Sequence, residues 1–280
     1  MSEGAAVNAA RQRALDERLS GLGSLVVAFS GGVDSAYLAV RAHLVLAARA
    51  LAVTADSASL ADVQRQAALD LARQYAFAHR VIETRELEDE AYLRNDSDRC
   101  YRCKSELFRR LLPLAEREGY AHVAYGLIAD DLSDFRPGHR AAAEAGVVSP
   151  LADVGITKDD VRSLSRMLGL PTWDRPASPC LSSRIPYGTA VTPEALRRVE
   201  RAEEGLRALG FRELRVRHLG EIARVELAPA ELSRLEDDAL CEAARDAVRN
   251  AGYRDAVIDR EGYRRGRLNE ALQVIPLARV

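Results

Sequence analysis

At 280 residues the chain can form one large domain or two ordinary ones, and 48% hydrophobic with 29% charged residues is typical of a soluble globular protein. The 40 basic and 42 acidic side chains give a net charge of −2, whereas nucleic-acid-binding chains usually carry a basic excess, so we do not expect nucleic acid as the main partner. Residues 1–22 lack the apolar core of a signal peptide and no later segment is long and apolar enough to span a bilayer, so we expect a cytoplasmic protein without a membrane partner.

The first half of the chain alternates apolar, strand-like runs with segments of helical character. The predicted strands are residues 25–29, 50–55, 79–82 and 122–125. The predicted helices are residues 14–22, residues 35 onward, residues 62–75 with Asp62 as the cap, and residues 104–118. This alternation predicts an α/β fold, a doubly wound parallel sheet with helices on both faces, in which ligands bind beyond the carboxyl ends of the strands. Ser30, Asp56 and Gly126 follow three of these strands and should converge on one crevice.

The turn after the first strand reads Ser-Gly-Gly-Val-Asp-Ser, residues 30–35, and is suited to phosphate binding. Gly31 and Gly32 let the backbone approach an anion, the first helical N–H groups point at it, and Ser30 and Ser35 can add hydroxyl donors. A carboxylate beside phosphates requires a divalent cation between them, so we predict that Asp34 binds Mg²⁺. Because the turn has no lysine and no third glycine, it is neither a Walker loop nor a dinucleotide fingerprint.

This turn in its strand-turn-helix context resembles the PP-loop of the ATP pyrophosphatases, which have an adenine nucleotide alpha hydrolase-like fold. The resemblance implies that ATP is cleaved between its α- and β-phosphates, that a substrate oxygen is adenylated, and that a nucleophile displaces AMP. We expect ATP to contact the turn together with Asp56, Ser57 and Gly126. The alternative is a tight turn whose glycines serve only packing.

The loop after the fourth strand, residues 126–138, contains three aspartates in five positions. Asp130, Asp131 and Asp134 could hold Mg²⁺ or position Arg136. They could equally form a solvated turn followed by helix caps.

Later segments suggest a site wall and then a second domain. Prolines between 171 and 179 should hold the chain extended next to Cys180 and Arg184, and an extended segment of this kind suits the wall of a binding site better than a core. Before this segment, helices are predicted at 139–146 and 157–168, and Thr157 and Asp160 form a capping box at the start of the second helix. After it, a helix is predicted at 193–209, followed by paired strands at 213–218 and 223–227. A helical region at 230–250 and a strand at 255–259 complete the chain. We therefore predict an α/β domain at 1–188 and a smaller α+β domain, for substrate binding or oligomerisation, at 189–280.

The cysteines can be explained in several ways. Cys100 and Cys103 form a C-x-x-C pair at a helix start, where the helix dipole favours thiolate, and alone they could be a redox pair, half a zinc site or half an iron–sulfur site. Together with Cys180 they could hold three irons of a 4Fe-4S cluster and leave the fourth iron open to sulfide. Three unrelated thiols are the alternative. We expect Cys241 to be a packed apolar thiol on a helix.

Across nearly its whole length the sequence resembles the LarE sulfur transferases, which make the nickel-pincer nucleotide cofactor of lactate racemase and related enzymes. The matching pieces are residues 28–36, 52–57, 99–104, 129–138, 175–188 and 215–218. The resemblance implies an enzyme that uses ATP and Mg²⁺ to adenylate a carboxylate of a pyridinium biscarboxylate mononucleotide, releases pyrophosphate, and converts the carboxylate to a thiocarboxylate. It also implies a homo-oligomer, with a hexamer as the expected size, and a sulfur donor that the sequence does not identify.

The same resemblance implies roles for individual residues. Cys180 matches the sulfur-bearing cysteine, which some members sacrifice to become dehydroalanine, whereas members that also have the C-x-x-C pair use a cluster. This chain is of the second kind. Arg184, Arg215 and Arg217 are expected to bind the substrate, and the last two, being two apart on a strand, project from one face and suit its phosphate. In one departure, Ile128 stands where the family usually has an asparagine, so that polar contact is missing.

Three other functions fit parts of the sequence. A transfer-RNA thiolase of the same superfamily could combine this loop with three cysteines, but the near-neutral charge argues against it. An amidating synthetase, such as those for NAD or GMP, would leave the cysteines unexplained. A non-catalytic ATP-binding domain would bind nucleotide without turnover.

Overall fold

The computed structural model describes residues 3–133, 137–176 and 179–264, which form two compact units. The first unit comprises Met1–Glu86 and Cys100–Ser178, and the second comprises Leu87–Arg99 and Pro179–Val280. The division falls before Pro179 instead of near residue 188, and the second unit includes a segment from the middle of the chain that the sequence did not point to.

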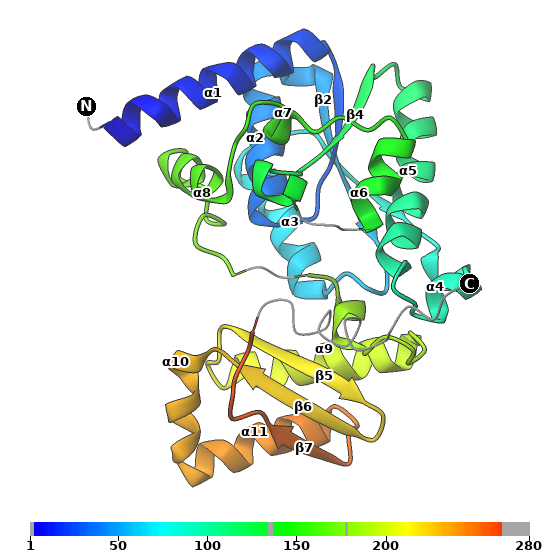
Figure 1. The fold of residues 1–280 in the computed structure, drawn as a ribbon, viewed down its shortest axis with the longest axis vertical. Helices are drawn as coiled ribbons and strands as arrows, with labels where there is room; N and C mark the ends of the chain where they lie inside the picture. The colour runs from blue at the N-terminus through cyan, green and yellow to red at the C-terminus, as the bar shows by residue number, and fades with distance from the viewer. Residues whose placement is uncertain (1–2, 134–136, 177–178, 265–280) are drawn as a thin grey trace. The chain divides into compact units, whose positions relative to one another are not determined.

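The first unit is built on a parallel sheet in the order β3-β2-β1-β4 (Figure 1). Its strands are β1 (Leu25–Ala28), β2 (Ala50–Asp56), β3 (His79–Glu83) and β4 (His122–Tyr125). Successive β1 residues alternate between two cores: Leu25 and Val27 lie in one cluster and Val26 in the other. Both faces of the sheet are therefore covered, which confirms the doubly wound α/β fold.

Helices from distant parts of the chain cover each face. The first face packs against α1 (Glu3–Leu22), α2 (Val33–Leu46), α3 (Asp62–Gln74) and α8 (Lys158–Met167). The second face packs against α5 (Arg99–Arg117) and α6 (Pro137–Glu144), and the two sets lie on opposite sides of the sheet in Figure 1. The shorter elements of this unit are η1 (Ala47–Arg49), η3 (Ala129–Ser133) and α7 (Pro150–Asp153).

Two local predictions in this unit need correction. The first helix begins at Glu3 instead of Ala14, because the alanine-rich segment before Ala14 has a high helix propensity although it contributes few buried residues. Asp62 does not cap α3: Ala61 occupies the cap position, and Asp62 is the first helical residue and pairs with Arg65. The predicted capping box at Thr157 and Asp160 is confirmed.

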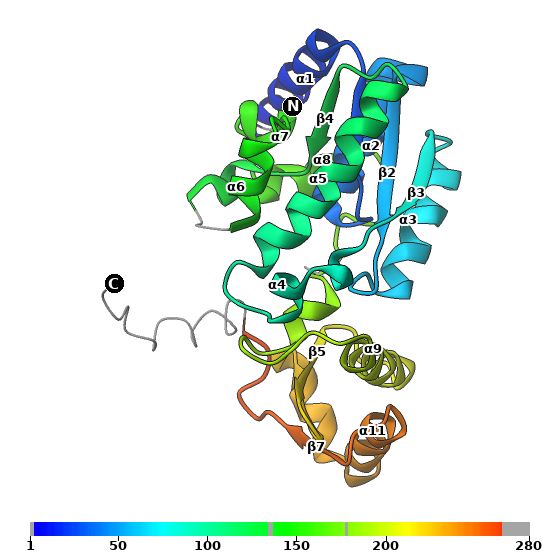
Figure 2. The same cartoon turned by 90° about the vertical axis from the view of Figure 1, so that its right-hand side faces the viewer.

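The second unit is a three-stranded sheet with two helices on one face. β5 (Leu214–Leu219) and β6 (Ile222–Leu227) are paired, as predicted, and run antiparallel. β6 pairs parallel with β7 (Asp255–Ile258). Figure 2 shows α9 (Pro193–Ala208) and α11 (Asp238–Asn250) side by side on the same side of β5 and β7. The remaining elements are η2 (Glu86–Glu88), which spans the division between the units, and α4 (Glu90–Leu93), η4 (Leu181–Arg184), α10 (Pro229–Leu232) and η5 (Ser233–Glu236).

The helices of the described ranges include none that is long and apolar enough to cross a bilayer.

Candidate functional site

The nucleotide loop, residues 30–35, connects β1 to α2 in the conformation that the sequence predicts for an anion-binding turn. Gly31 has a φ of +72°, and a Cβ there would lie 3.2 Å from the Ala68 side chain, so both the backbone angle and the space require glycine. Gly32 is the cap residue of α2, and no described side chain caps this helix. The hydroxyls of Ser30 and Ser35 lie 3.2 Å apart. The start of α2 is thus free to present N–H groups to an anion.

A pocket of about 200 Å³ opens beside this loop, at the carboxyl ends of β1, β2 and β4. Five of the residues predicted to contact nucleotide line it: Ser30, Gly32, Asp34, Ser35 and Gly126. The described lining residues do not include Gly31, Asp56 or Ser57, so ATP contacts by these three stay predictions. Of the three residues expected to converge on one crevice, Ser30 and Gly126 line this pocket and Asp56 is not among its described lining residues, whereas α5 adds Lys104 and Leu107 to its wall.

Gly126 lets β4 approach the nucleotide loop closely. A Cβ at this position would lie 2.9 Å from the backbone nitrogen of Ser35 and 3.1 Å from the carbonyl carbon of Asp34. We expect Gly126→Ala to push the loop from its position, at a cost of about 1–3 kcal/mol, and to weaken ATP binding by roughly tenfold or more, measured by calorimetry.

The matched control for this substitution is Gly21→Ala, because a Cβ at Gly21 has no described atom within 4 Å. This variant should bind ATP like the parent. Unchanged ATP affinity in Gly126→Ala would show that the close approach of β4 does not shape the pocket.

Two lysines lie beside the loop, which itself has none. The ammonium of Lys158, the first residue of α8, lies 2.6 Å from both carboxylate oxygens of Asp34. The ammonium of Lys104 lies 5.6 Å from the centre of the Tyr125 ring, within cation–π range. The Lys158 pair joins residues 124 positions apart, so no local sequence pattern could have revealed it.

The aspartate-rich loop after β4 is tied to the same region. Asp130 accepts a hydrogen bond from the backbone nitrogen of Lys158 at 2.5 Å, and Asp131 accepts one from the backbone of Ile128 at 3.5 Å. Ile128, which stands where the resemblance leads us to expect an asparagine, is 2% exposed and packs in the core. Asp134 and Arg136 lie outside the described residues, and a Mg²⁺ role for these aspartates stays a prediction.

The segment that carries Cys180 is held by buried polar residues of the second unit. Cys180 is half-buried, and the hydroxyl of Ser182 donates to its sulfur at 3.6 Å. The hydroxyl of Tyr92 lies 2.7 Å from that of Ser182, and Arg99 donates to the Ser182 carbonyl at 2.8 Å. Arg99 directly precedes Cys100 in the chain. The residue next to the C-x-x-C pair therefore helps to position the segment around the third cysteine.

Asn95 completes this support. Its side-chain amide donates to the carbonyls of Pro186 and Thr189, each at 2.8 Å, and its own oxygen accepts a hydrogen bond from Arg99. Asn95 is fully buried and has a φ of +60°, a conformation that asparagine tolerates better than most residues. These contacts explain why Leu87–Arg99 belongs to the second unit.

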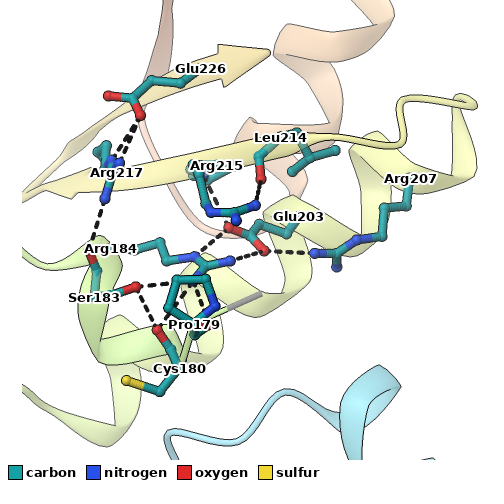
Figure 3. Close-up of polar contacts among 11 residues, drawn as sticks. Pro179, Cys180, Ser183, Arg184, Glu203, Arg207, Leu214, Arg215, Arg217 and Glu226 are labelled. Atoms are coloured by element: carbon teal, nitrogen blue, oxygen red, sulfur yellow. Dashed lines mark hydrogen bonds and ion pairs between the residues drawn. The ribbon is translucent and has the colours of Figure 1, made fainter. Parts of the chain in front are cut away.

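Arg184 is held by an ion pair and by backbone contacts within the protein (Figure 3). Its Nε and Nη2 donate to the two carboxylate oxygens of Glu203 at 2.7 and 3.1 Å, and its Nη1 donates to the Pro179 carbonyl at 2.6 Å. Both side chains of the pair are 1% exposed. Arg184 thus links α9 to the backbone next to Cys180, and its expected contact with substrate stays a prediction.

Glu203 is the centre of this cluster. It also accepts hydrogen bonds from Arg207 at 2.7 Å and from the backbone nitrogen of Val216 at 3.2 Å. Burial by itself would raise the pKa of Glu203, but the charges and hydrogen bonds of Arg184 and the charge of Arg207 bring that pKa below its ordinary value.

Arg215 and Arg217 lie on one face of β5, as predicted, but both are buried. Arg217 donates to Glu226 at 2.9 Å and to the Ser183 carbonyl at 2.8 Å. The guanidinium of Arg215 lies 4.7 Å from the centre of the Tyr263 ring, and burial together with Arg184 lowers the pKa of Arg215. Arg217 thus contacts the backbone that follows Cys180, and the contact of either arginine with a substrate phosphate stays a prediction.

Cys100 is exposed, and Cys103, Cys180 and Cys241 are half-buried. Cys100 and Cys103 lie at the start of α5 within the first unit, and Cys180 lies in the second unit. Across the described ranges, the structure forms no group of three or more His, Cys, Asp or Glu side chains that could hold a metal ion. Cys241 lies on α11 as expected, but it is half-buried instead of fully packed. The iron–sulfur and Mg²⁺ sites therefore stay predictions.

Comparison with known proteins identifies relatives that match most of the chain. No protein-family model matches it. A protein of Synechocystis sp., uncharacterized slr1717, is 44% identical over 247 residues, which are 88% of this chain and 92% of the relative. An uncharacterized protein of Methanocaldococcus jannaschii is 28% identical over 240 residues, which are 86% of this chain and 90% of that protein.

The third relative carries a specific name. The pyridinium-3,5-bisthiocarboxylic acid mononucleotide synthase of Lactiplantibacillus plantarum is 36% identical over 273 residues, which are 96% of this chain and 98% of that enzyme. Identity at this level over almost the whole of both sequences shows a common family. The chain therefore belongs to the LarE family of pyridinium-3,5-bisthiocarboxylic acid mononucleotide synthases.

Proposed function

We propose that the protein is an ATP-dependent sulfur transferase that acts on a pyridinium biscarboxylate mononucleotide in the synthesis of the nickel-pincer nucleotide. A carboxylate oxygen of the substrate attacks the α-phosphorus of ATP, and pyrophosphate leaves. A sulfur nucleophile then attacks the activated carbonyl, AMP leaves, and a thiocarboxylate remains. The observation that carries the proposal is the pocket at the nucleotide loop in a chain that matches a named bisthiocarboxylic acid mononucleotide synthase.

The pocket has the donors that a magnesium nucleotide requires. The uncapped start of α2 and the hydroxyls of Ser30 and Ser35 favour phosphate oxygens. Asp34 lines the pocket and supplies carboxylate oxygens, the ligand type that Mg²⁺ prefers. When bound, Mg²⁺ would neutralise charge on the leaving pyrophosphate. The residues present therefore fit ATP with Mg²⁺.

The second unit supplies the substrate and sulfur residues of the proposal. Arg215 and Arg217 would bind the substrate phosphate, because guanidinium groups pair well with phosphate oxygens. Cys180, with Cys100 and Cys103 of the first unit, would hold an iron–sulfur cluster, and the donor chemistry fits because cysteine thiolates are the ligands of such clusters. Such a cluster supplies an open iron that can carry sulfur. Ser182, Arg99 and Arg184 position the segment that carries Cys180.

Release of pyrophosphate on addition of each candidate substrate tests this function. We expect release from ATP only when the pyridinium biscarboxylate mononucleotide is present. In Asp34→Ala that release should be lost while the fold, checked by circular dichroism, persists, because Asp34 lies on a binding loop outside the core.

Other outcomes of the same assay would point elsewhere. Release that depends on transfer RNA would favour the thiolase, and release that depends on ammonia with a nucleotide carboxylate or oxo group would favour an amidating synthetase. ATP binding with no turnover under any condition would favour a non-catalytic domain. Unchanged release in Asp34→Ala would remove Asp34 from the site.

A further inference from the structure

A hydrogen-bond relay of His79, Thr54 and Phe29 runs across the first sheet to the start of the nucleotide loop. Its residues come from β3, from β2 and from the end of β1, which are neighbours in the sheet. The hydroxyl of Thr54 donates to the carbonyl of Phe29, the residue directly before Ser30, at 2.8 Å. Nε2 of His79, the first residue of β3, lies 2.8 Å from the same hydroxyl. Thr54 is 1% exposed and Phe29 is 2% exposed, so both partners of the central bond are buried.

The donors and acceptors determine the direction of this relay. A carbonyl oxygen can only accept, so the single proton of the Thr54 hydroxyl points to Phe29. Nε2 of His79 is then the donor to Thr54. Burial lowers the pKa of His79, so at neutral pH the ring carries one proton, and the contact with Thr54 requires it on Nε2. The rings of Phe29 and Phe77 pack edge-on against the His79 ring, with centroids 5.6 and 6.4 Å away, and hold its orientation.

The Thr54 hydroxyl binds the backbone at the point where β1 passes into the nucleotide loop. The nitrogen of Phe29 donates to the Val53 carbonyl at 2.8 Å, which extends the pairing of β1 with β2 by one residue. The carbonyl of Phe29 is bound by a side chain, that of Thr54. Loss of this hydroxyl would deprive a buried carbonyl of its hydrogen bond, which is costly because no water replaces it.

The same bond controls the orientation of the first peptide unit of the loop. The carbonyl of Phe29 and the N–H of Ser30 belong to one planar peptide unit and point in opposite directions. The nitrogen of Ser30 donates to the Ser35 hydroxyl at 3.3 Å, and that hydroxyl donates to the Gly32 carbonyl at 3.2 Å. Rotation of this peptide plane would break the bond to Thr54 and the bond to Ser35 together. The first and last residues of the nucleotide loop therefore depend on the bond that Thr54 makes.

We propose that Thr54 is a positioning residue for nucleotide binding: its hydroxyl, aimed by His79, fixes the peptide unit that precedes Ser30 and keeps the nucleotide loop in its phosphate-binding shape. Phe29, Ser30 and Thr54 all line the pocket at this loop, so a rotation of that peptide unit would change the pocket wall. This inference rests on the proposed use of ATP and adds two residues that act through the loop.

Substitutions at Thr54 test the inference, because valine nearly keeps the shape of the side chain and serine keeps its hydroxyl. Thr54→Val should weaken calorimetric binding of a non-hydrolysable ATP analogue with Mg²⁺ by roughly tenfold, the effect of losing one buried hydrogen bond. Thr54→Ser should bind the analogue like the parent. The matched control is Thr172→Val: Thr172 is also 1% exposed, and its hydroxyl has no hydrogen-bond partner among the described residues, so binding should not change.

The binding results separate this inference from the proposed function. If the parent and Thr54→Val bind the analogue equally, Thr54 has a structural role only, and the inference fails while the function stands. If Thr54→Ser binds as weakly as Thr54→Val, the hydroxyl is not the group that matters, and the inference also fails. If the parent does not bind the analogue, the inference and the proposed function both fail.

Two measurements on the nucleotide-free protein separate positioning from direct contact of Thr54 with the nucleotide. Hydrogen exchange of the Ser30 amide, followed by NMR, should be several-fold faster in Thr54→Val than in the parent, because this amide loses its fixed direction toward Ser35. An unchanged exchange rate would overturn the inference. Nitrogen NMR of the parent should find the His79 proton on Nε2, and a proton on Nδ1 alone would overturn the relay. This second measurement needs no variant, so it decides the question even if Thr54→Val does not fold.

Discussion

Replacing Glu203 with glutamine is expected to destabilise the second unit by about 3–5 kcal/mol, the cost of removing one partner from a buried ion pair. Glutamine keeps the shape of the side chain but removes its charge. Arg184 would then remain buried without its counter-charge, and Arg207 and the Val216 nitrogen would lose a charged acceptor. Because Arg184 also binds the Pro179 carbonyl, the backbone next to Cys180 should loosen as well. Urea unfolding followed by circular dichroism measures the change.

The matched control lies on the same helix. Glu194 pairs with Arg198 one turn along α9 and is 67% exposed. Exposed pairs of this kind contribute about 0.3–0.5 kcal/mol to the free energy of unfolding. The free energy of unfolding of Glu194→Gln should therefore be almost that of the parent. If Glu203→Gln and Glu194→Gln lose similar amounts of stability, the burial of the Glu203 cluster does not determine how much the cluster stabilises the fold.

Acid sensitivity gives a second measurement on Glu203. Its pKa is below the ordinary value in the folded state, because the attraction of Arg184 and its neighbours exceeds the effect of burial. The unfolded chain binds the proton at about pH 4.3. The stabilising contribution is therefore complete above that pH and is lost as pH falls through the folded pKa. Between neutral pH and about pH 3, Glu203→Gln should lose less stability than the parent.

Replacing Cys180 with alanine is expected to abolish thiocarboxylate formation completely. Pyrophosphate release should persist, because the nucleotide loop and its pocket belong to the first unit and do not use Cys180. Product is measured by mass spectrometry of the small-molecule fraction. Cys241→Ala is the matched control: Cys241 is a half-buried thiol on α11, and its removal should leave product formation unchanged.

The cluster proposal adds further expectations for the same variants. Protein purified without oxygen should be brown and contain about four irons per chain, the stoichiometry of a 4Fe-4S cluster. Alanine at Cys100, Cys103 or Cys180 should remove the iron, whereas Cys241→Ala should retain it. If each chain instead loses one sulfur from Cys180 and stops after a single transfer, the side chain is the sulfur donor and the cluster proposal fails.

Local sequence patterns predicted most of the secondary structure. Apolar runs predicted all four strands of the first sheet, and the Thr157–Asp160 box predicted the start of α8. The Ser-Gly-Gly-Val-Asp-Ser turn, residues 30–35, predicted a pocket-lining loop because glycines and an uncapped helix start are local features. Asp62 was misassigned because several residues near a helix start can serve as the cap, and here the backbone places Ala61 there.

The pairing of charged side chains was decided only by the tertiary structure. Lys158 reaches Asp34 across 124 positions, and Arg184 meets Glu203 in a buried pair that no periodic pattern distinguishes from exposed charges. Arg99 likewise joins the segment around Cys180 across 83 positions. Sequence by itself determined the elements, the nucleotide loop and the family resemblance, because these depend on neighbouring residues or on matched motifs. Which cation neutralises which carboxylate depends on the path of the whole backbone, and only the folded chain brings those groups together.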